Sequence, residues 1–266
     1  MQLFSSLENR VNTRMPAGHR MAHQLCFIVH DVMAQSLVSG MNASVFHRTF
    51  KFLDDEDRKA FQQAESPFAW LEQSRRVDKW ADLYVNTVFP AVLSDMLHCF
   101  YEALETSRKG KLCISYMLIR KPIKESLFLL ESIIIDRHDF ATKLATEPMK
   151  LFGPAAGGVE AHAKRIRRVL AMVGEADRFD ANYLARLRYD KPGRDSFDGA
   201  CDKATHLFTD RAAILTELSN INFIFSTEKE KGTQWSYLYS RLPYLLIYIH
   251  CLVEHVYTSI VPDAAT

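Results

Sequence analysis

Apolar residues recur every three to four positions along most of this chain, which is the spacing of one face of an α-helix. The most apolar segment is 112–136. Four of its residues share one face at helical spacing: Ile123, Leu127, Leu130 and Ile134. Other apolar residues fill much of the remaining circumference, and a helix that is apolar nearly all round is buried on most sides. We therefore expect the segment 112–136 to be the central helix of the fold.

A second apolar helix is predicted over residues 235–260. Its apolar residues share one face: Leu242, Leu246, Ile249, Val253, Val256 and Ile260. The stretch is long enough to cross a bilayer, which needs about 20 residues. However, it carries His250, Glu254 and His255, and charge in the middle of a bilayer is expensive. We therefore expect a buried core helix that packs against 112–136, and no membrane partner.

Helical periodicity also covers most of the remaining chain. It predicts helices over 16–39, 67–107 (with a break near Pro90), 159–173, 198–209 and 210–218, and loops over 151–158, 190–195 and 228–233. We find neither the alternating runs that mark strands nor the repeats that mark solenoids. The pattern predicts an all-α fold, a multi-helix bundle of about eight to ten helices. We expect one domain over 1–266, with a mobile loop or sub-domain boundary at 151–158.

Composition places the chain among ordinary globular proteins. It has 266 residues with 33 basic and 32 acidic side chains, and 48% of the residues are hydrophobic. These values exclude a disordered chain and a wholly basic nucleic-acid coat protein. The start of the chain lacks the basic residues and the apolar run of a secretory signal, and the five cysteines form no Cys-x-x-Cys pair. We expect a cytoplasmic protein without disulfides and without a cofactor.

Three histidines and a cysteine share one face of the helix predicted over 16–39. His19, His23, Cys26 and His30 fall within an arc of about 60°. The spacing of His19 and His23 is one that metal ligands use on a helix. Because the stripe is about 16 Å long, one ion can bind His19 and His23, or His23 and Cys26, with a third ligand from another helix. The alternative is a seam between helices in which the imidazoles are hydrogen bonded.

Positive charge is concentrated between residues 161 and 194. This segment holds nine basic and four acidic residues, although the whole chain has a net charge of +1. A basic patch attracts phosphate groups. The residues proposed here for nucleic-acid binding are Lys164, Arg167, Arg168, Arg186 and Arg188. They indicate RNA as a possible partner, and the alternative is a solvated basic face without a ligand.

Charged residues interrupt the apolar segment 112–136 on either side of Pro122. Proline removes a backbone hydrogen bond, so we expect a kink in the helix at this point. A buried charge is costly unless it is paired. We therefore expect Arg120 and Glu125 either to form an internal ion pair or to face a cleft, and we regard this charged kink as a candidate site.

The pattern Leu118-x-Arg120-x4-Glu125-x3-Leu129 on this helix resembles uncharacterised helical bacterial proteins that are grouped with the HEPN superfamily. The resemblance covers about twenty residues. HEPN proteins are helical bundles, often dimeric, and many are metal-independent RNases of toxin–antitoxin or phage-defence systems. Their catalytic Arg-x4–6-His pattern occurs here once, from Arg14 to His19, with a proline and a glycine inside it. The resemblance therefore supports the fold more than the activity.

Three functions remain open on the sequence. The first is a helical-bundle protein that binds a protein partner or forms a homo-oligomer, because apolar helices are abundant and no complete catalytic set is evident. The resemblance implies the second, a HEPN-like RNase. In that scheme His206 or His19 acts as acid or base and an arginine steadies the phosphate; the candidate catalytic residues are His206, Arg120 and Glu125. The third is a metal-binding bundle that uses His19 and His23.

Overall fold

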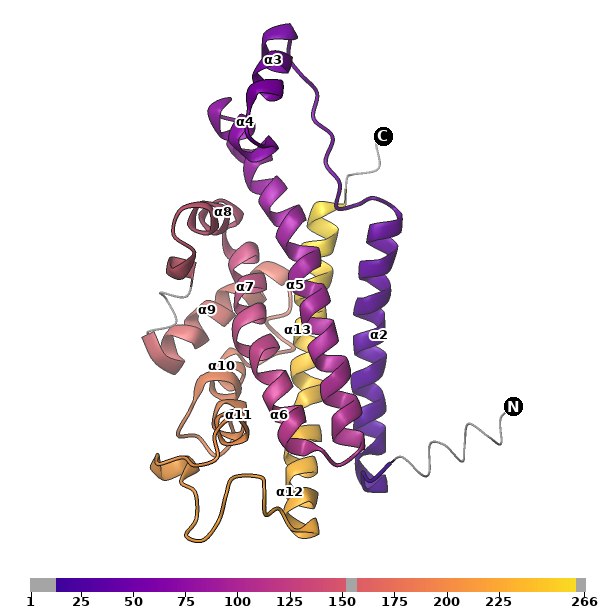
Figure 1. The fold of residues 1–266 in the computed structure, drawn as a ribbon, viewed down its shortest axis with the longest axis vertical. Coiled ribbons are helices and arrows are strands. Elements are labelled where there is room, and N and C mark those ends of the chain that lie inside the picture. Colours follow the sequence, from indigo (N-terminus) through magenta and orange to yellow (C-terminus); the bar gives the residue numbers. More distant parts are fainter. Residues whose placement is uncertain (1–12, 152–156, 262–266) are drawn as a thin grey trace, which may run out of the picture.

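The computed structural model describes residues 13–151 and 157–261, and within these ranges it contains helices and no strand (Figure 1). In chain order the α-helices are α2 (Arg20–Asn42), α3 (Asp55–Gln63), α4 (Pro67–Gln73), α5 (Val77–Arg108), α6 (Leu112–Lys121), α7 (Leu127–Ile135), α8 (Arg137–Thr146), α9 (Gly158–Val173), α10 (Ala181–Tyr189), α11 (Phe197–Thr205), α12 (Glu228–Tyr239) and α13 (Leu242–Ile260). The predicted all-α, multi-helix bundle is confirmed. Of the loop predicted over 151–158, residues 152–156 lie outside the described part of the chain.

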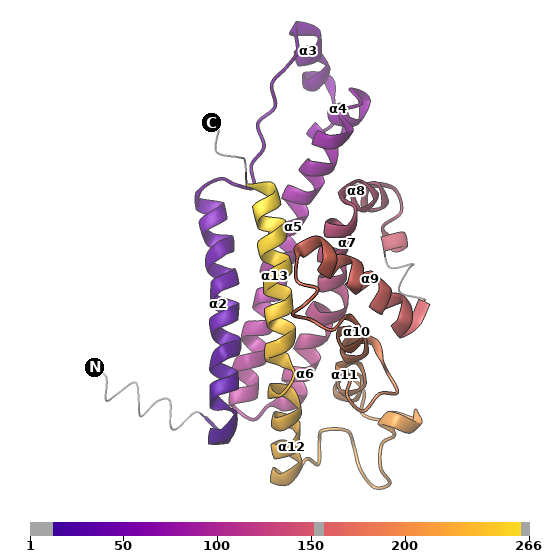
Figure 2. The same cartoon turned by 180° about the vertical axis from the view of Figure 1, so that it is seen from behind.

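Helices that run along the longest axis of the molecule form its centre (Figure 1 and Figure 2). Helix α13 packs against α2, α5 and α7, and α5 packs against α2 and α6. The apolar faces predicted for 112–136 and 235–260 are buried in this core, and Leu127 and Ile249 are both fully inaccessible to solvent. The two apolar segments are inner helices in contact with each other through α7 and α13, as expected.

The segment 112–136 is one rod made of α6, a π-helical turn (Pro122–Ser126) and α7. Proline cannot donate a backbone hydrogen bond, and a local π turn is one way for a helix to accommodate it. In this turn the Leu127 N–H donates to the Pro122 carbonyl, five residues earlier. In a regular α-helix Leu127 would bind the Ile123 carbonyl. That carbonyl is therefore left for a partner outside the rod.

Arg188 of α10 supplies this partner and forms a buried ion pair with Glu131 of α7. Its Nε donates to the Ile123 carbonyl over 2.7 Å, and its Nη1 donates to the Glu131 carboxylate. The hydroxyl of Tyr248 in α13 donates to the same carboxylate over 2.9 Å. Burial opposes the charge on Arg188, but Glu131 and the hydroxyls of Tyr189 and Tyr248 outweigh it and raise the pKa of the guanidinium. These bonds attach α10 and α13 to the central rod.

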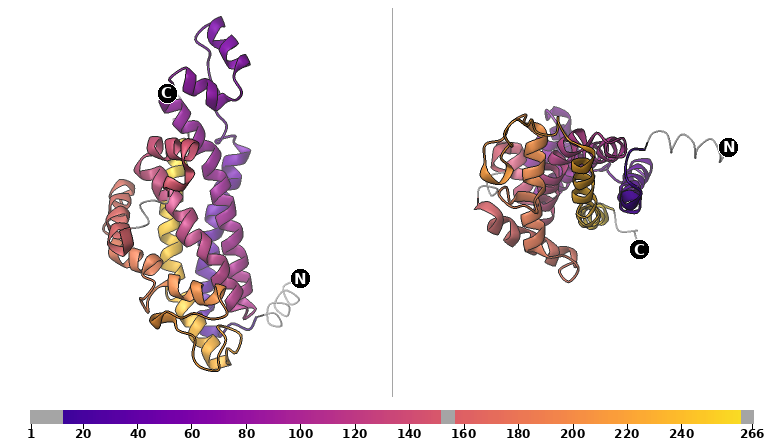
Figure 3. Two further views of the ribbon diagram at one scale, coloured as in Figure 1. Left: turned by 60° about the vertical axis from the view of Figure 1, so that its left-hand side comes forward. Right: turned by 90° about the horizontal axis from the view of Figure 1, so that it is seen from below.

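Shorter helices cover one side of the rod and extend both ends of the molecule (Figure 3). Helices α8 to α11 lie on the side of α6 and α7 that faces away from α2, with α9 packed on α7 and α11 on α6. Helices α3 and α4 form a projecting end, which is held by a second apolar cluster around Trp70 and Trp80. Helix α2 forms the opposite edge, with α5 and α13 on its inner side.

Two predicted helix boundaries are wrong because of proline. Helix α5 continues through Pro90 without the expected break, since buried Phe89 and Leu93 hold the helix on both sides of the proline. The helix expected over 235–260 is divided into α12 and α13, with Ser240 and Arg241 between them. Pro243 lies in the first turn of α13, where its missing N–H costs nothing.

Two further predictions fail between α11 and α12. Residues 210–218 were expected to be helical, but they contain only the short 3-10 helix Ala212–Ile214. The expected loop at 228–233 is the first part of α12. There the Thr227 side chain accepts from the Glu230 N–H while the Glu230 carboxylate accepts from the Thr227 N–H. Such a capping box stabilises a helix start despite a run of charged residues.

Candidate functional site

A polar cavity of about 350 Å³ lies beside the C-terminal end of α11, and two predicted site residues line it. Arg120 comes from the end of α6, and His206 follows directly after α11. The remaining lining residues are Lys191, Asp202, Phe208, Thr209, Asp210, Arg211 and Ile214. The fold therefore brings together an arginine and a histidine that lie 86 positions apart in the sequence (206 − 120).

Hydrogen bonds hold the wall of this cavity in place. The buried amide of Asn222 donates to the His206 carbonyl over 3.0 Å and to Thr209 Oγ1 over 3.2 Å. Lys191 pairs with Asp202 at 2.6 Å, which neutralises its charge. An imidazole beside a guanidinium can exchange a proton with a hydroxyl while the guanidinium holds an anionic oxygen. The cavity contains both groups.

Glu125 lies near Arg120 but lines a different cavity. Arg120 Nη1 is 3.9 Å from Glu125 Oε1, and the two side chains are 37% and 52% exposed, so their ion pair lies at the surface. Glu125 lines a neighbouring cavity of about 240 Å³ together with Lys124, Phe128, Gly158, His162, Tyr189 and Asp198. The predicted set of His206, Arg120 and Glu125 is thus divided between two cavities.

Four of the five residues predicted to bind nucleic acid are exposed. Lys164, Arg167 and Arg168 lie on the outer side of α9, and Arg186 is exposed on α10. The prediction for Arg188 is wrong, because its side chain is 0% exposed and is paired with Glu131. A count of basic residues cannot separate a solvated arginine from one that neutralises a buried carboxylate.

The histidine stripe of α2 faces the interior of the bundle. His23 donates from Nε2 to the Leu104 carbonyl over 3.3 Å, and His30 Nε2 lies 3.2 Å from the Leu97 carbonyl. Burial lowers the pKa of His23 and raises the pKa of the Cys26 thiol to about 12. Within the described residues, no group of three His, Cys, Asp or Glu side chains is placed to hold a metal ion, so His19 and His23 have no third ligand there. The stripe has the geometry of a hydrogen-bonded seam between α2 and α5.

The opposite face of α2 carries an exposed apolar stripe, which the sequence analysis missed. Met21, Leu25, Ile28 and Val32 are 83%, 40%, 53% and 45% exposed. Their alternating spacing of four, three and four residues keeps them within an arc of about 60°, about 160° around the helix from the histidine stripe. An amphipathic helix normally buries its aliphatic residues. The helical spacing of these four residues is visible in the sequence. It shows an exposed face only when the histidines on the other side of the helix are known to point into the bundle.

Comparison of the chain with family models, with curated proteins and with solved structures gives no match. None of the described helices is both long and apolar enough to span a membrane.

Proposed function

We propose that this protein works by self-association and that two copies pair through the outward faces of their α2 helices. The observation that carries this proposal is the exposed stripe of Met21, Leu25, Ile28 and Val32. In a monomer these four side chains face water, while the other side of the same helix buries histidines. Pairing removes the apolar surface from water, which is worth about 25 cal/mol for each Å².

The stripe is self-complementary when two α2 helices run antiparallel about a two-fold axis. An axis midway between Leu25 and Ile28 places Leu25 against the partner's Ile28 and Met21 against the partner's Val32. The steps of four, three and four residues average about 3.7 residues, close to one helical turn, so the stripe stays on one face of α2 and can remain in contact with a partner helix along its length. Two-fold symmetry closes such an assembly at two copies, since each stripe is covered by the other.

Charge complementarity favours a second copy of this chain as the occupant. Apart from its histidines, α2 carries two charged residues, Arg20 and Asp31, and both are exposed. Both residues lie on the same side of the stripe. In an antiparallel pair related by a two-fold axis, that side of one α2 helix lies next to the same side of the partner's α2 helix. The two-fold axis brings Arg20 to within about 3 Å, measured along the helix axis, of the level of the partner's Asp31. Symmetry repeats this pair on the other side of the axis.

A charge-reversal cycle tests the pairing. We expect Arg20→Asp and Asp31→Arg each to weaken the dimer about tenfold, because each variant places like charges across the seam. The double variant restores opposite charges and is expected to return the dissociation constant to within about twofold of the original. Sedimentation equilibrium measures these constants, and Lys59→Asp, on the distant helix α3, is the matched control. A double variant that is no tighter than the singles would show that the antiparallel pairing is wrong.

A metal-independent RNase activity of the HEPN type is a second candidate function. It is favoured by the cavity that Arg120 and His206 share, since both residue types were expected in such a site. In this scheme His206 exchanges a proton with the ribose hydroxyl or the leaving oxygen, and Arg120 holds the phosphate. The exposed basic side chains of α9 would add attraction for the RNA backbone.

Incubation with labelled RNA, with and without EDTA, tests this second candidate. We expect cleavage that EDTA leaves unchanged and that His206→Ala reduces by about 10²–10⁴-fold. His98→Ala, which removes an exposed histidine of α5 outside the cavity, is expected to keep the full rate. Absence of cleavage at high protein concentration contradicts this function, and so does cleavage that EDTA abolishes.

A further inference from the structure

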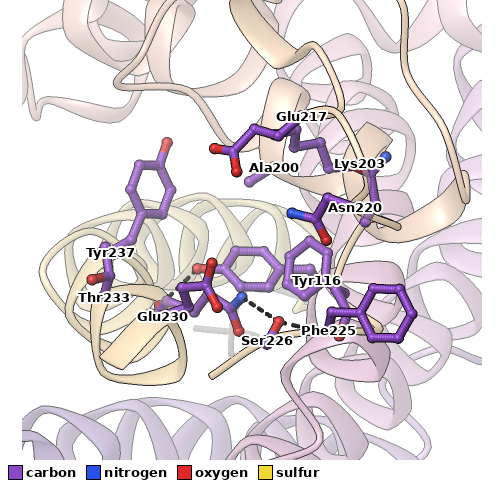
Figure 4. Close-up of a pocket in the computed structure, with 13 residues that line it drawn as sticks. Tyr116, Ala200, Lys203, Glu217, Asn220, Phe225, Ser226, Glu230, Thr233 and Tyr237 are labelled. Carbon is purple, nitrogen blue, oxygen red and sulfur yellow. Dashed lines mark hydrogen bonds between the residues drawn. The ribbon is translucent and has the colours of Figure 1, made fainter. Parts of the chain in front are cut away.

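A cavity of about 390 Å³ beside α11 and α12 shares no lining residue with the cavity that holds His206. Figure 4 shows its lining residues, which come from α6, α11, α12 and the segment before α12. Such a volume lies within the range of small-molecule sites. The cavity is independent of the α2 stripe and of the cavity that holds Arg120.

Aromatic rings form one side of this cavity. Tyr116 of α6 is packed against Phe223 and Tyr237, with ring centroids 5.6 Å and 6.4 Å away. The Tyr116 hydroxyl is already used, because it donates to the Gln234 carbonyl over 2.8 Å. Aromatic faces carry partial negative charge and attract organic cations.

Hydrogen-bond acceptors with free capacity also line the cavity. Gln234 donates from Nε2 to Ser226 Oγ over 3.1 Å, and its Oε1 is buried without a hydrogen-bond partner among the described residues. Figure 4 shows the Glu217 carboxylate among the side chains that line the cavity. Glu230 uses one oxygen on the Thr227 N–H, and this bond lowers the pKa of Glu230 and keeps it ionised. A ligand that satisfies these groups must bring hydrogen-bond donors.

The charge of the lining points to the same chemistry. Glu217 and Glu230 are acidic and Lys203 is the one basic residue that lines the cavity, so the lining has a net charge of −1. A ligand in this cavity faces two carboxylates, one ammonium group and four aromatic rings, so negative groups outnumber positive ones. The sign of the field therefore favours a cation.

The segment that carries half of the lining is held in a fixed shape. Asn222 bonds it to the end of α11, and the Thr216 hydroxyl donates to Asn222 Oδ1 over 3.0 Å. Ser219 and Phe223 have φ angles of 61° and 60°, in the left-handed region that costs non-glycine residues about 1–3 kcal/mol. A backbone conformation of this kind persists only where the surrounding contacts hold the residue in it. The cavity is thus built before a ligand arrives.

We propose that this cavity binds an organic cation rich in N–H donors, of the guanidinium class, with an apolar stem against Tyr116 and Phe223. The guanidinium donates to Glu217, to Gln234 Oε1 and to the unused oxygen of Glu230. The group is either a free alkylguanidine or the arginine side chain of another protein. Both carry a guanidinium group on an apolar stem, which is the group that the lining residues are proposed to bind.

Calorimetric titration of the full chain tests this proposal with two cationic probes and one neutral probe. The cationic probes are agmatine and a blocked Gly-Arg-Gly tripeptide, which separate the two sources. The neutral probe is butylurea, which has the shape of an alkylguanidine without its charge. We expect saturable binding of at least one cationic probe, about tenfold or more tighter than any binding of butylurea.

Substitutions assign that binding to the cavity. Glu217→Gln is expected to weaken the cationic probe about tenfold. Glu228→Gln, which changes the same charge in the first turn of α12 outside the lining, is expected to stay within about twofold. The proposal is overturned if neither cationic probe binds at millimolar concentration, if butylurea binds equally well, or if the two variants weaken binding by the same factor.

Discussion

Replacing Arg188 with methionine is expected to lower the free energy of unfolding by about 3–5 kcal/mol. The substitution removes the guanidinium that donates to the Glu131 carboxylate in a site that is 0% exposed, and leaves Arg165 Nε, 3.6 Å away, as the nearest positive charge. It also removes the donor for the Ile123 carbonyl, which the π-helical turn leaves outside the helix ladder. Urea unfolding followed by circular dichroism measures the change.

Two further variants separate the buried pair from a general effect of losing an arginine. Arg186→Met changes an exposed arginine two positions earlier on the same helix, and its effect is expected to stay within about 0.5 kcal/mol. The double variant Arg188→Met with Glu131→Leu removes both charges and is expected to regain part of the lost stability, since the Ile123 carbonyl and the Tyr248 hydroxyl still lack their partners. An Arg188→Met protein as stable as the Arg186→Met protein would contradict the described core.

The double variant Leu25→Glu with Ile28→Glu is expected to weaken self-association at least about 100-fold. Because Leu25 faces the partner's Ile28 in the proposed pair, the variant gathers four carboxylates at the centre of the seam. Both positions are exposed in the single chain, so the melting temperature of the monomer is expected to change little. Size-exclusion chromatography with light scattering gives the mass.

A control on the same helix makes this result specific. Val38 and Met41 are 49% and 61% exposed on α2 but lie off the stripe. Val38→Glu with Met41→Glu adds the same charge to the same helix, and the dimer is expected to persist. If both double variants behave alike, general charge on α2 rather than the stripe governs association.

The inner helices could be predicted from the sequence because a helix that is buried on most sides needs apolar residues around most of its circumference, and this pattern is visible in a short stretch of sequence. Ile123, Leu127 and Leu130 repeat at helical spacing, and all three are buried. The loss of a regular helical hydrogen bond expected at Pro122 is observed as a π-helical turn. At Pro90 the same residue type leaves the helix intact, because packing of neighbouring side chains decides the outcome there and packing cannot be inferred from local sequence.

The candidate sites depend on contacts between distant segments, and for this reason the sequence indicated them only in part. Arg120 and His206 were each singled out, but only the fold places them in one cavity. Arg188 belongs to a basic segment of the sequence, which suggests an exposed side chain. Its side chain is nevertheless buried, because it pairs with Glu131, which is 57 positions away in the chain. The cavity lined by Tyr116 and Glu217 gave no signal, since its residues come from four separate segments.

In the proposed dimer, the apolar stripe of α2 is covered by a second copy of the chain. Sedimentation velocity of the unmodified protein over a concentration series up to about 100 μM tests it most directly. We expect the mass to rise with concentration to twice the 30.5 kDa of one chain and to rise no further. A mass of 30.5 kDa at every concentration would contradict the account, and so would growth beyond two copies.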